Sequence, residues 1–170
     1  MTTIIGITDG RTMVLAGDKT ASDGATNVLS LTSKVYRFGD SVVMGFAGSW
    51  RGGLLAVEGL NGLDVDDPEC NISDMTSTIS AAWREADFKN EDTTFLIGYS
   101  GQWFEVQPDL GHIEIWGDYH SIGSGSQFAL GSLYTSSDEL TERQRIAVAF
   151  EAAQKWTGAS EIYNVVEVTA

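Results

Sequence analysis

The chain begins Met1-Thr2-Thr3-Ile4-Ile5-Gly6-Ile7, so its second residue is a threonine. Threonine is small enough for methionine aminopeptidase to remove the methionine ahead of it. Removal would leave Thr2 with a hydroxyl and a free α-amine, which together make a nucleophile with its own general base. A free α-amine has a pKa of about 8, so roughly a tenth to a third of it is neutral near neutral pH. Thr2 alone does not decide the matter, because a threonine here also suits the start of a strand.

A lysine and an aspartate further along the chain suit this chemistry. An ammonium near the α-amine of Thr2 makes protonation of that amine more costly and enlarges its neutral fraction. Lys34 could provide the ammonium, and Asp18 could hold Lys34 in place and keep it charged. The alternative is that Asp18 and Lys34 form an exposed ion pair, worth about 0–1 kcal/mol.

Two glycine-containing segments are candidates for holding a substrate. Gly45-Phe46-Ala47-Gly48 follows a predicted strand, and glycine there lets a substrate backbone approach and lets an amide act as an oxyanion donor. Gly123-Ser124-Gly125-Ser126 could present hydroxyls and amides near the nucleophile. Taken singly, an ordinary turn and a loop that caps the next helix are the more common explanations of these segments.

Strand patterns and helix patterns occur in separate blocks along the chain. Asp9-Gly10 is typical of a hairpin turn. Thr141 and Gln144 form a capping box at the start of the clearest helix, and Gly158 suits its end. The predicted strands are 3–7, 12–16, 35–38, 41–46, 93–99, 103–108, 112–116 and 162–168, and the predicted helices are 52–60, 75–86, 124–134 and 141–156. Such separate blocks indicate antiparallel sheets packed with helices, here in one domain over residues 1–170.

The composition argues against several classes of function. A net charge of −14 over 170 residues is unsuited to non-specific binding of nucleic acid. No apolar run reaches the roughly 18 residues of a membrane helix, and the N-terminus lacks a signal-peptide pattern, so we expect a cytoplasmic protein without membrane contact. The single cysteine, Cys70, cannot form an internal disulfide. His112 and His120 are too few and too isolated for a metal site or a histidine triad, and we expect no metal and no cofactor.

Taken in order, five segments resemble the proteasome β-type threonine peptidases, and among them the HslV-like branch. The segments are Thr2-Thr3-Ile4-Ile5-Gly6-Ile7, Ala16-Gly17-Asp18, Lys34-Val35, Gly45-Phe46-Ala47-Gly48 and Gly123-Ser124-Gly125-Ser126. Counted from Thr2, Asp18 and Lys34 stand at the spacing that this family uses, without a gap. The resemblance implies an N-terminal nucleophile hydrolase fold, which is an α+β, four-layer α-β-β-α sandwich of two antiparallel sheets.

The resemblance also implies catalytic roles. Thr2 would be the nucleophile and its α-amine the base. Asp18, Lys34 and Ser124 would support catalysis, and Gly45 would provide the oxyanion amide.

For substrate binding, the resemblance implies two segments that pair with a peptide as an added strand. One contains Ala21 and Ser22, and the other contains Ala47 and Gly48. Val43 is our candidate for the floor of the primary specificity pocket, and a small apolar floor should favour apolar side chains loosely.

The family also implies partners. Its rings of six or seven subunits stack in pairs and hide the sites inside, so we expect a homo-oligomeric ring, of undecided size, that cleaves peptides or unfolded proteins. The implied AAA+ ATPase partner is doubtful, because residues 82–93 form a shorter segment than in the family and the chain ends a few residues short of the tail that docks the ATPase. Proteasome subunits carry an aspartate and, three residues later, a serine near the last helix. Here Thr157 replaces the aspartate, and the serine is present as Ser160.

Two other functions remain open from the sequence. A catalytically silent ring or scaffold subunit of the same fold would explain the shorter segments, but it has no reason to keep Thr2, Asp18 and Lys34 together. An amidohydrolase acting on a small amide is the other alternative. Many such enzymes use cysteine or serine, and the Ala47-Gly48 pattern suits peptides better.

Overall fold

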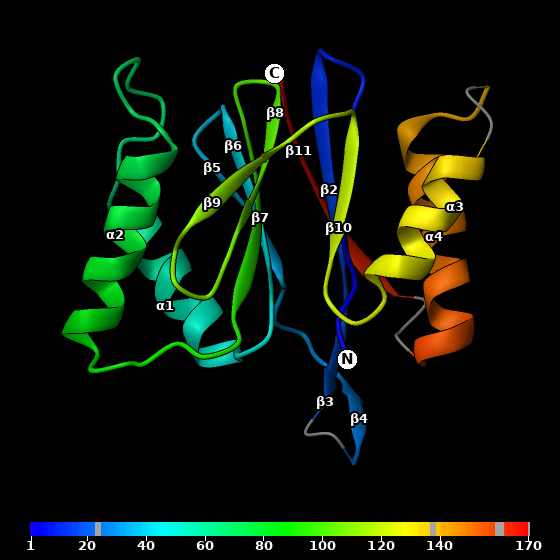
Figure 1. Ribbon diagram of the computed structural model, residues 1–170, viewed down its shortest axis with the longest axis horizontal. Coiled ribbons are helices and arrows are strands. Elements are labelled where there is room, and N and C mark those ends of the chain that lie inside the picture. The colour runs from blue at the N-terminus through cyan, green and yellow to red at the C-terminus, as the bar shows by residue number, and fades with distance from the viewer. Residues whose placement is uncertain (23–24, 137–138, 159–161, 170) are drawn as a thin grey trace.

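The computed structural model describes residues 1–22, 25–136, 139–158 and 162–169. Over these residues the chain is an α-β-β-α sandwich: α1 and α2 cover the outer face of one sheet, and α3 and α4 cover the outer face of the other (Figure 1). The predicted α+β sandwich of antiparallel sheets is therefore confirmed.

The N-terminal strand lies inside the first sheet, whose order is β10-β1-β2-β11. β1 pairs antiparallel with β2 on one side and with β10 on the other, so that Ile4 is opposite both Gly17 and Ile122. Every residue of β1 is buried. The strands of this sheet are β1 (Ile4–Thr8), β2 (Thr12–Asp18), β10 (Tyr119–Ile122) and β11 (Tyr163–Thr169).

The second sheet has the order β5-β6-β7-β8-β9, with antiparallel neighbours throughout. A small separate hairpin, β3 with β4, projects beyond the sandwich close to the N-terminus (Figure 1). The strands are β3 (Thr20–Ser22), β4 (Asn27–Leu29), β5 (Val35–Phe38), β6 (Val42–Ala47), β7 (Thr94–Tyr99), β8 (Gln102–Val106) and β9 (His112–Ile115).

Capping interactions define the ends of several helices. The predicted capping box is present in α4, where Thr141 Oγ1 accepts from Gln144 N, and Gly158 ends the helix with a φ of 67°, a conformation that glycine adopts without a Cβ penalty. The N-cap of α1 is Ser49, whose hydroxyl accepts from Gly52 N. The helices are α1 (Trp50–Leu60), α2 (Ile72–Glu85), α3 (Ser126–Thr135) and α4 (Glu142–Thr157).

The buried apolar residues form a cluster in each of the spaces between layers. β6 separates two of these spaces because successive strand residues point to opposite faces. Phe46 lies in the cluster beneath α1 and α2, whereas Val43 and Ala47 lie in the cluster between the sheets. This alternation decides which β6 side chains could face a substrate.

Three strands were not predicted. β3 and β4 have three residues each, and β10 has the mixed sequence Tyr-His-Ser-Ile, which shows no alternation. β10 matters for function, because it leads directly into the segment that contains Ser124. Among the described residues, no helix is long and apolar enough to cross a membrane.

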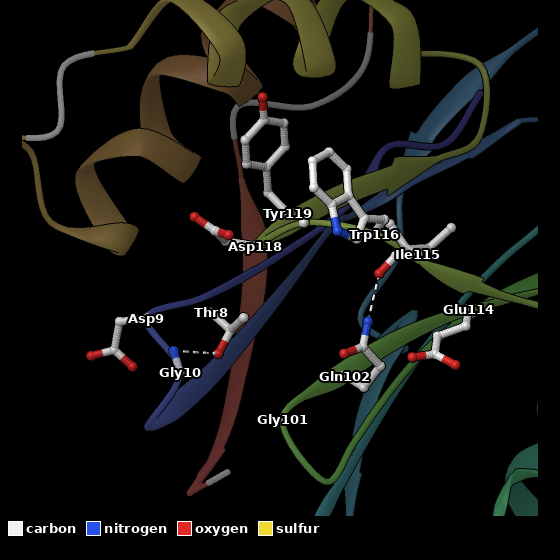
Figure 2. Close-up of a pocket in the computed structure, with 11 residues that line it drawn as sticks. Thr8, Asp9, Gly10, Gly101, Gln102, Glu114, Ile115, Trp116, Asp118 and Tyr119 are labelled. Atoms are coloured by element: carbon white, nitrogen blue, oxygen red, sulfur yellow. Dashed lines mark hydrogen bonds between the residues drawn. The ribbon is translucent and has the colours of Figure 1, made fainter.

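A cavity of about 1150 Å³ lies at the end of the sandwich where β1 turns into β2 (Figure 2). The β9–β10 connection borders it and carries Trp116, which is fully exposed. The lining residues are Thr8, Asp9, Gly10, Gly101, Gln102, Glu114, Ile115, Trp116, Gly117, Asp118 and Tyr119. This cavity is at the far end of β1 from Thr2, about 20 Å away at the usual rise of a strand.

Candidate active site

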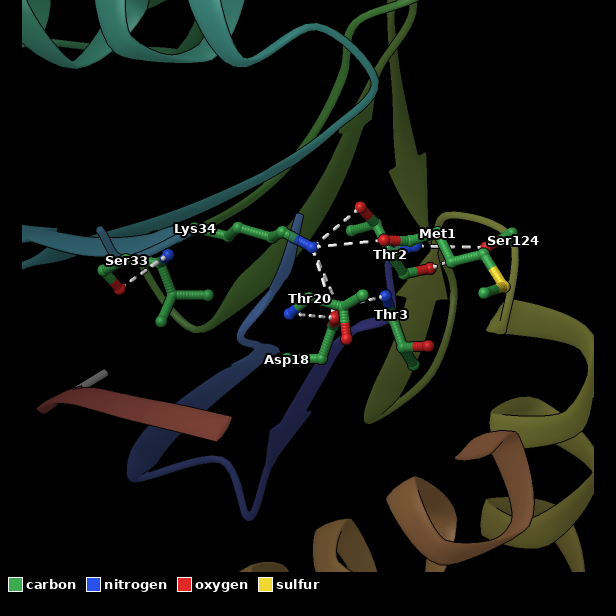
Figure 3. Close-up of polar contacts among 9 residues, drawn as sticks. Met1, Thr2, Thr3, Asp18, Thr20, Ser33, Lys34 and Ser124 are labelled. Carbon is green, nitrogen blue, oxygen red and sulfur yellow. Dashed lines mark hydrogen bonds and ion pairs between the residues drawn. The ribbon is translucent and has the colours of Figure 1, made fainter. Parts of the chain in front are cut away.

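Thr2 stands just before β1, at the point where three segments distant in sequence converge (Figure 3). Asp18 is the last residue of β2, and Ser124 follows β10 after one intervening residue. Lys34 immediately precedes β5 of the other sheet. Because β2 and β10 are the two neighbours of β1, their ends bring Asp18 and Ser124 to either side of the N-terminal threonine.

The ammonium of Lys34 is the centre of the site. Lys34 Nζ donates to Thr2 Oγ1 at 2.9 Å and to the carbonyl oxygen of Met1 at 3.3 Å. It also lies 3.2 Å from each carboxylate oxygen of Asp18. Lys34 is only 2% exposed. The lysine is therefore fixed with its charge directed at the threonine hydroxyl.

Asp18 is tied to the backbone as well as to the lysine. Its Oδ1 accepts from Thr3 N at 2.6 Å, and its Oδ2 accepts from Thr20 N at 2.8 Å. Asp18 is 1% exposed. Hydrogen bonds and a cationic partner offset the cost of burying a carboxylate. The same bonds fix the start of β1, so the carboxylate positions both the lysine and the threonine.

Ser124 approaches Thr2 from the opposite side, within a loop that only glycine permits. Thr2 N donates to Ser124 Oγ at 3.1 Å, and Ser124 Oγ lies 3.3 Å from the carbonyl oxygen of Thr2. Gly125 N also donates to that carbonyl, at 3.2 Å. Gly123 has a φ of +91°, and a Cβ at this position would lie 2.4 Å from Thr2 O. Two glycines thus let the loop close tightly around Thr2.

Burial and charge act in opposite directions on Lys34. Desolvation by burial lowers the pKa of the ammonium below its ordinary value, and the Coulombic attraction and hydrogen bonding of Asp18 raise it in part. Lys34 Nζ also lies 5.7 Å from the centre of the Trp50 ring. Sequence reasoning did not identify Trp50, and no local pattern marks it, since it becomes a neighbour of Lys34 only through the position of α1.

Met1 is in place in this structure, so the nitrogen of Thr2 is a peptide nitrogen rather than an amine. The Met1 carbonyl takes one of the hydrogen bonds of Lys34. The geometry is therefore that of the site before the α-amine is exposed.

Two predicted residues lie inside β6, away from the exposed end of the strand. Val43 is fully buried and packs between the sheets, and it is not among the residues that line the two described cavities, so its role as a pocket floor stays a prediction. Gly45 is inside β6, opposite Val35 and Leu96, and a Cβ on it would meet Ile4 at 2.6 Å. Both residues point into the space between the sheets, because they share one phase of the strand alternation.

The other predicted substrate-binding residues lie at the end of the sandwich that holds Thr2. Ala21 and Ser22 belong to β3, and Ala47 ends β6. Gly48 follows with a φ of +104°, and it is exposed. Ala21 and Ser22 line a second cavity, of about 250 Å³, together with Thr26, Val28 and Trp50.

The remaining expectations concern histidines, metals and Ser160. His120 lies 2.5 Å from Glu105, and the His112 ring packs edge-on against Phe104, both away from Thr2. Over the described part of the chain, no group of three or more His, Cys, Asp or Glu side chains could hold a metal ion. Ser160 lies outside the described residues.

The layered fold is of the N-terminal nucleophile hydrolase type. In it, a threonine next to the N-terminus lies between Lys34, Asp18 and Ser124. The family model of the proteasome subunit matches residues 1–53. The chain is 29% identical to the ATP-dependent protease subunit HslV of Roseobacter denitrificans over 150 residues, which cover 86% of this chain and 80% of that protein.

Solved structures agree on the fold. The eukaryotic HslV of Trypanosoma brucei superposes with a TM-score of 0.81 at 22% identity and covers 99% of both chains. Thiobacillus denitrificans BPH in complex with epoxomicin gives a TM-score of 0.79 at 20% identity, covering 99% of this chain and 98% of that one. The chain therefore resembles HslV along most of its length and the proteasome subunit family over its first 53 residues.

Proposed function

We propose that this HslV-like threonine peptidase cleaves peptide bonds with Thr2 as its nucleophile, after Met1 has been removed. The observation that carries the proposal is the contact of 2.9 Å from Lys34 Nζ to Thr2 Oγ1, made by a lysine that is buried and paired with Asp18. A fixed ammonium beside the hydroxyl stabilises the negative charge that develops on Oγ1 as its proton leaves.

The α-amine of Thr2 is the proposed general base. Before processing, the Thr2 nitrogen is 3.1 Å from Ser124 Oγ, so Ser124 would hold the freed amine in the same position. The nearby Lys34 charge disfavours protonation of the amine and keeps more of it neutral near neutral pH. Removal of Met1 also removes one acceptor of Lys34 Nζ, which leaves an N–H free for the reacting groups.

The oxyanion donor that we propose is the amide of Gly48 in place of Gly45. Phe46 N donates to Lys34 O at 3.1 Å, which brings the end of β6 beside the lysine. Gly48 comes two residues later, beyond the paired part of the strand, and its positive φ turns the backbone there. A side chain at this position would collide with Asp92 O at 2.3 Å, so the turn requires glycine.

The proposed substrate is a peptide or an unfolded protein. Ala21 and Ser22 on β3, and the backbone from Ala47 to Gly48, border the same end of the molecule. An extended peptide can add to such backbone edges through main-chain hydrogen bonds, largely independently of its sequence.

The silent-scaffold alternative is less well supported. Burying Lys34 and Asp18 carries a desolvation cost that an apolar pair of the same volume would avoid. A scaffold has no use for this buried pair, whereas a nucleophilic Thr2 uses the fixed charge of Lys34. The small-amide alternative predicts a different class of substrate, so the substrates that the protein cleaves distinguish it from the peptidase.

The experiment measures the N-terminal mass and the hydrolysis of a fluorogenic peptide for the wild type, Thr2→Ala and Thr2→Ser. We expect loss of Met1 and a loss of activity of at least about 10³-fold in Thr2→Ala, with Thr2→Ser retaining part of the rate. Comparable hydrolysis by a folded Thr2→Ala protein would reject the proposal.

We also propose a cytoplasmic, closed homo-oligomeric ring built from a single peptidase domain over residues 1–170. Exposed aromatic residues on α3 and α4 support an assembly: Phe128 is 41% exposed, Trp156 is 68% exposed, and the two rings stack with centroids 6.3 Å apart. Light scattering distinguishes a ring from an 18.3 kDa monomer.

Stimulation by an HslU-type ATPase is proposed to be weak or absent. The motivation is the short segment after α2, which ends at Glu85 with β7 beginning at Thr94. The test mixes the peptidase with such an ATPase and ATP, and a large ATP-dependent rise in casein or peptide turnover would contradict this expectation.

A further inference from the structure

Trp50 is the aromatic side chain that faces the charged centre of the site. It is the first residue of α1, and its ring centre lies 5.7 Å from Lys34 Nζ. A cation within about 6 Å of an indole face is attracted by the negative charge of that face, and the attraction grows when water is excluded. Lys34 is 2% exposed, so this condition is met.

The Trp50 ring is itself held in a fixed orientation. It packs edge-on against Phe46 of β6, with centroids 5.6 Å apart and planes at 83°. Phe46 is 1% exposed and in turn stacks on Tyr36 at 6.4 Å. Because packing already fixes the ring, its contact with the ammonium costs little additional side-chain entropy.

The neighbouring cation does not compete for this ring. Arg51 follows Trp50 in α1, but its guanidinium lies over the Phe88 ring at 5.8 Å and donates to Ala86 O at 3.2 Å. Lys34 is therefore the cation that Trp50 contacts. Among the described residues, the titratable groups in contact with Lys34 are Asp18 and, once Met1 is removed, Thr2 with its amine.

We propose that Trp50 is a positioning residue for Lys34, whose ring keeps the buried ammonium charged and directed at Thr2. The inference rests on the proposed function. Its importance increases with processing, because removal of Met1 takes away a carbonyl acceptor of Lys34 Nζ while the ring remains. Trp50 also lines the cavity of about 250 Å³, so a substrate group bound there would shield the same contact from water.

The test compares Trp50→Leu and Trp50→Phe in the assembled protein. Trp50→Leu keeps an apolar side chain but removes the π face, so we expect kcat to fall about 3- to 10-fold, as loss of a desolvated cation–π contact implies. Because the ring favours the charged lysine, its loss should move the alkaline limb of the kcat–pH profile to lower pH. Trp50→Phe keeps a smaller π face and should restore part of both effects.

Trp116→Leu is the matched control, since it makes the same change at a fully exposed tryptophan beyond the far end of β1. Melting temperatures of the Trp50 variants equal to that of the wild type would exclude a folding defect. A KM change alone, with kcat and the alkaline limb as in the wild type, would overturn the inference. Thr2→Ala measured in parallel separates the two proposals: if it is inactive while Trp50→Leu behaves as the wild type, only the role of Trp50 fails.

Discussion

The two ends of the sandwich each carry a cavity, and the smaller one lies beside the chemistry. At the far end, the carboxylates of Asp9, Glu114 and Asp118 border a cavity of about 1150 Å³, and all three residues are exposed. At the Thr2 end the cavity is about 250 Å³, but Lys34 and Asp18 beside it are 2% and 1% exposed.

The two ends differ in how far their charged groups are exposed to water. The pKa of Asp9 is lowered by backbone N–H groups, first of Thr12 and then of Arg11, as expected for a turn in solvent. Lys34 is held by Asp18 where water cannot replace it, and its pKa is lowered by burial. Cavity size therefore says less about reactivity than the burial of charge does.

The largest expected effect comes from removing the buried charge. Lys34→Met should lower kcat by about 10²–10⁴-fold, and its acidic limb should move to higher pH, because the α-amine loses the cation that disfavours its protonation. It should also destabilise the fold by about 3 kcal/mol, since Asp18 is left buried without its cation. Peptide hydrolysis over a pH series and urea unfolding measure the two effects.

Lys155→Met is the control for this change. Lys155 also lies beside a tryptophan, with Nζ 5.8 Å from the Trp156 ring, but it is exposed. It should leave kcat unchanged and stability within about 0.5 kcal/mol. Similar losses in the two variants would remove the distinction between the buried and the exposed lysine.

A pair of glycine variants compares the two ends directly. Gly123 and Gly10 both have positive φ, 91° and 82°, but a Cβ at Gly123 would lie 2.4 Å from Thr2 O while one at Gly10 would meet nothing within 4 Å. Gly10→Ala should cost about 1–2 kcal/mol for the conformation alone. Gly123→Ala should cost about 1–3 kcal/mol more and lower kcat, because Ser124 is displaced from Thr2. Equal unfolding free energies of Gly10→Ala and Gly123→Ala would show that the loop around Gly123 accommodates a Cβ at no extra cost.

The Thr2 end should also show a dependence of stability on pH. Because the pKa of Lys34 is lowered on folding, the unfolded chain binds more protons between the folded pKa and the model value of 10.5. The free energy of unfolding contributed by this group therefore rises with pH in that window. In urea unfolding from about pH 8 to about pH 10, the unfolding free energy of the wild type should increase relative to that of Lys34→Met. A constant or falling difference would contradict the assignment.

The smallest effect is expected at the far end. Trp116→Leu and Asp118→Asn replace exposed residues, so each should change the stability by less than about 0.5 kcal/mol and kcat/KM by less than about twofold. A large loss of activity in either variant would mean that the ends of the sandwich are coupled.

The layers could be predicted from the sequence because their elements have strong local patterns. α4 has its capping box and Gly158, and the β1–β2 turn has Asp9-Gly10. β10 was missed because its four residues pair at the edge of a sheet whose other members are distant in sequence. Its position is a tertiary property.

The site shows the same limit. Thr2, Asp18 and Lys34 were predicted from residue types and spacing, and Ser124 joined them through the family resemblance; the structure brings all four together. Their catalytic roles stay predictions. The burial of Val43 between the sheets could not be predicted, because β6 is apolar on both faces and its sequence does not reveal which residues point between the sheets.

The closure of Ser124 onto Thr2 joins residues 122 positions apart in the chain. Such long-range contacts form late, because the intervening chain must first be ordered. A chain emerging from the ribosome presents Thr2 well before β10 and Ser124 have been synthesised. Under the proposed mechanism, the nascent chain cannot cut itself or its neighbours, and proteolysis begins only when the N-terminal strand has been enclosed by the rest of the molecule.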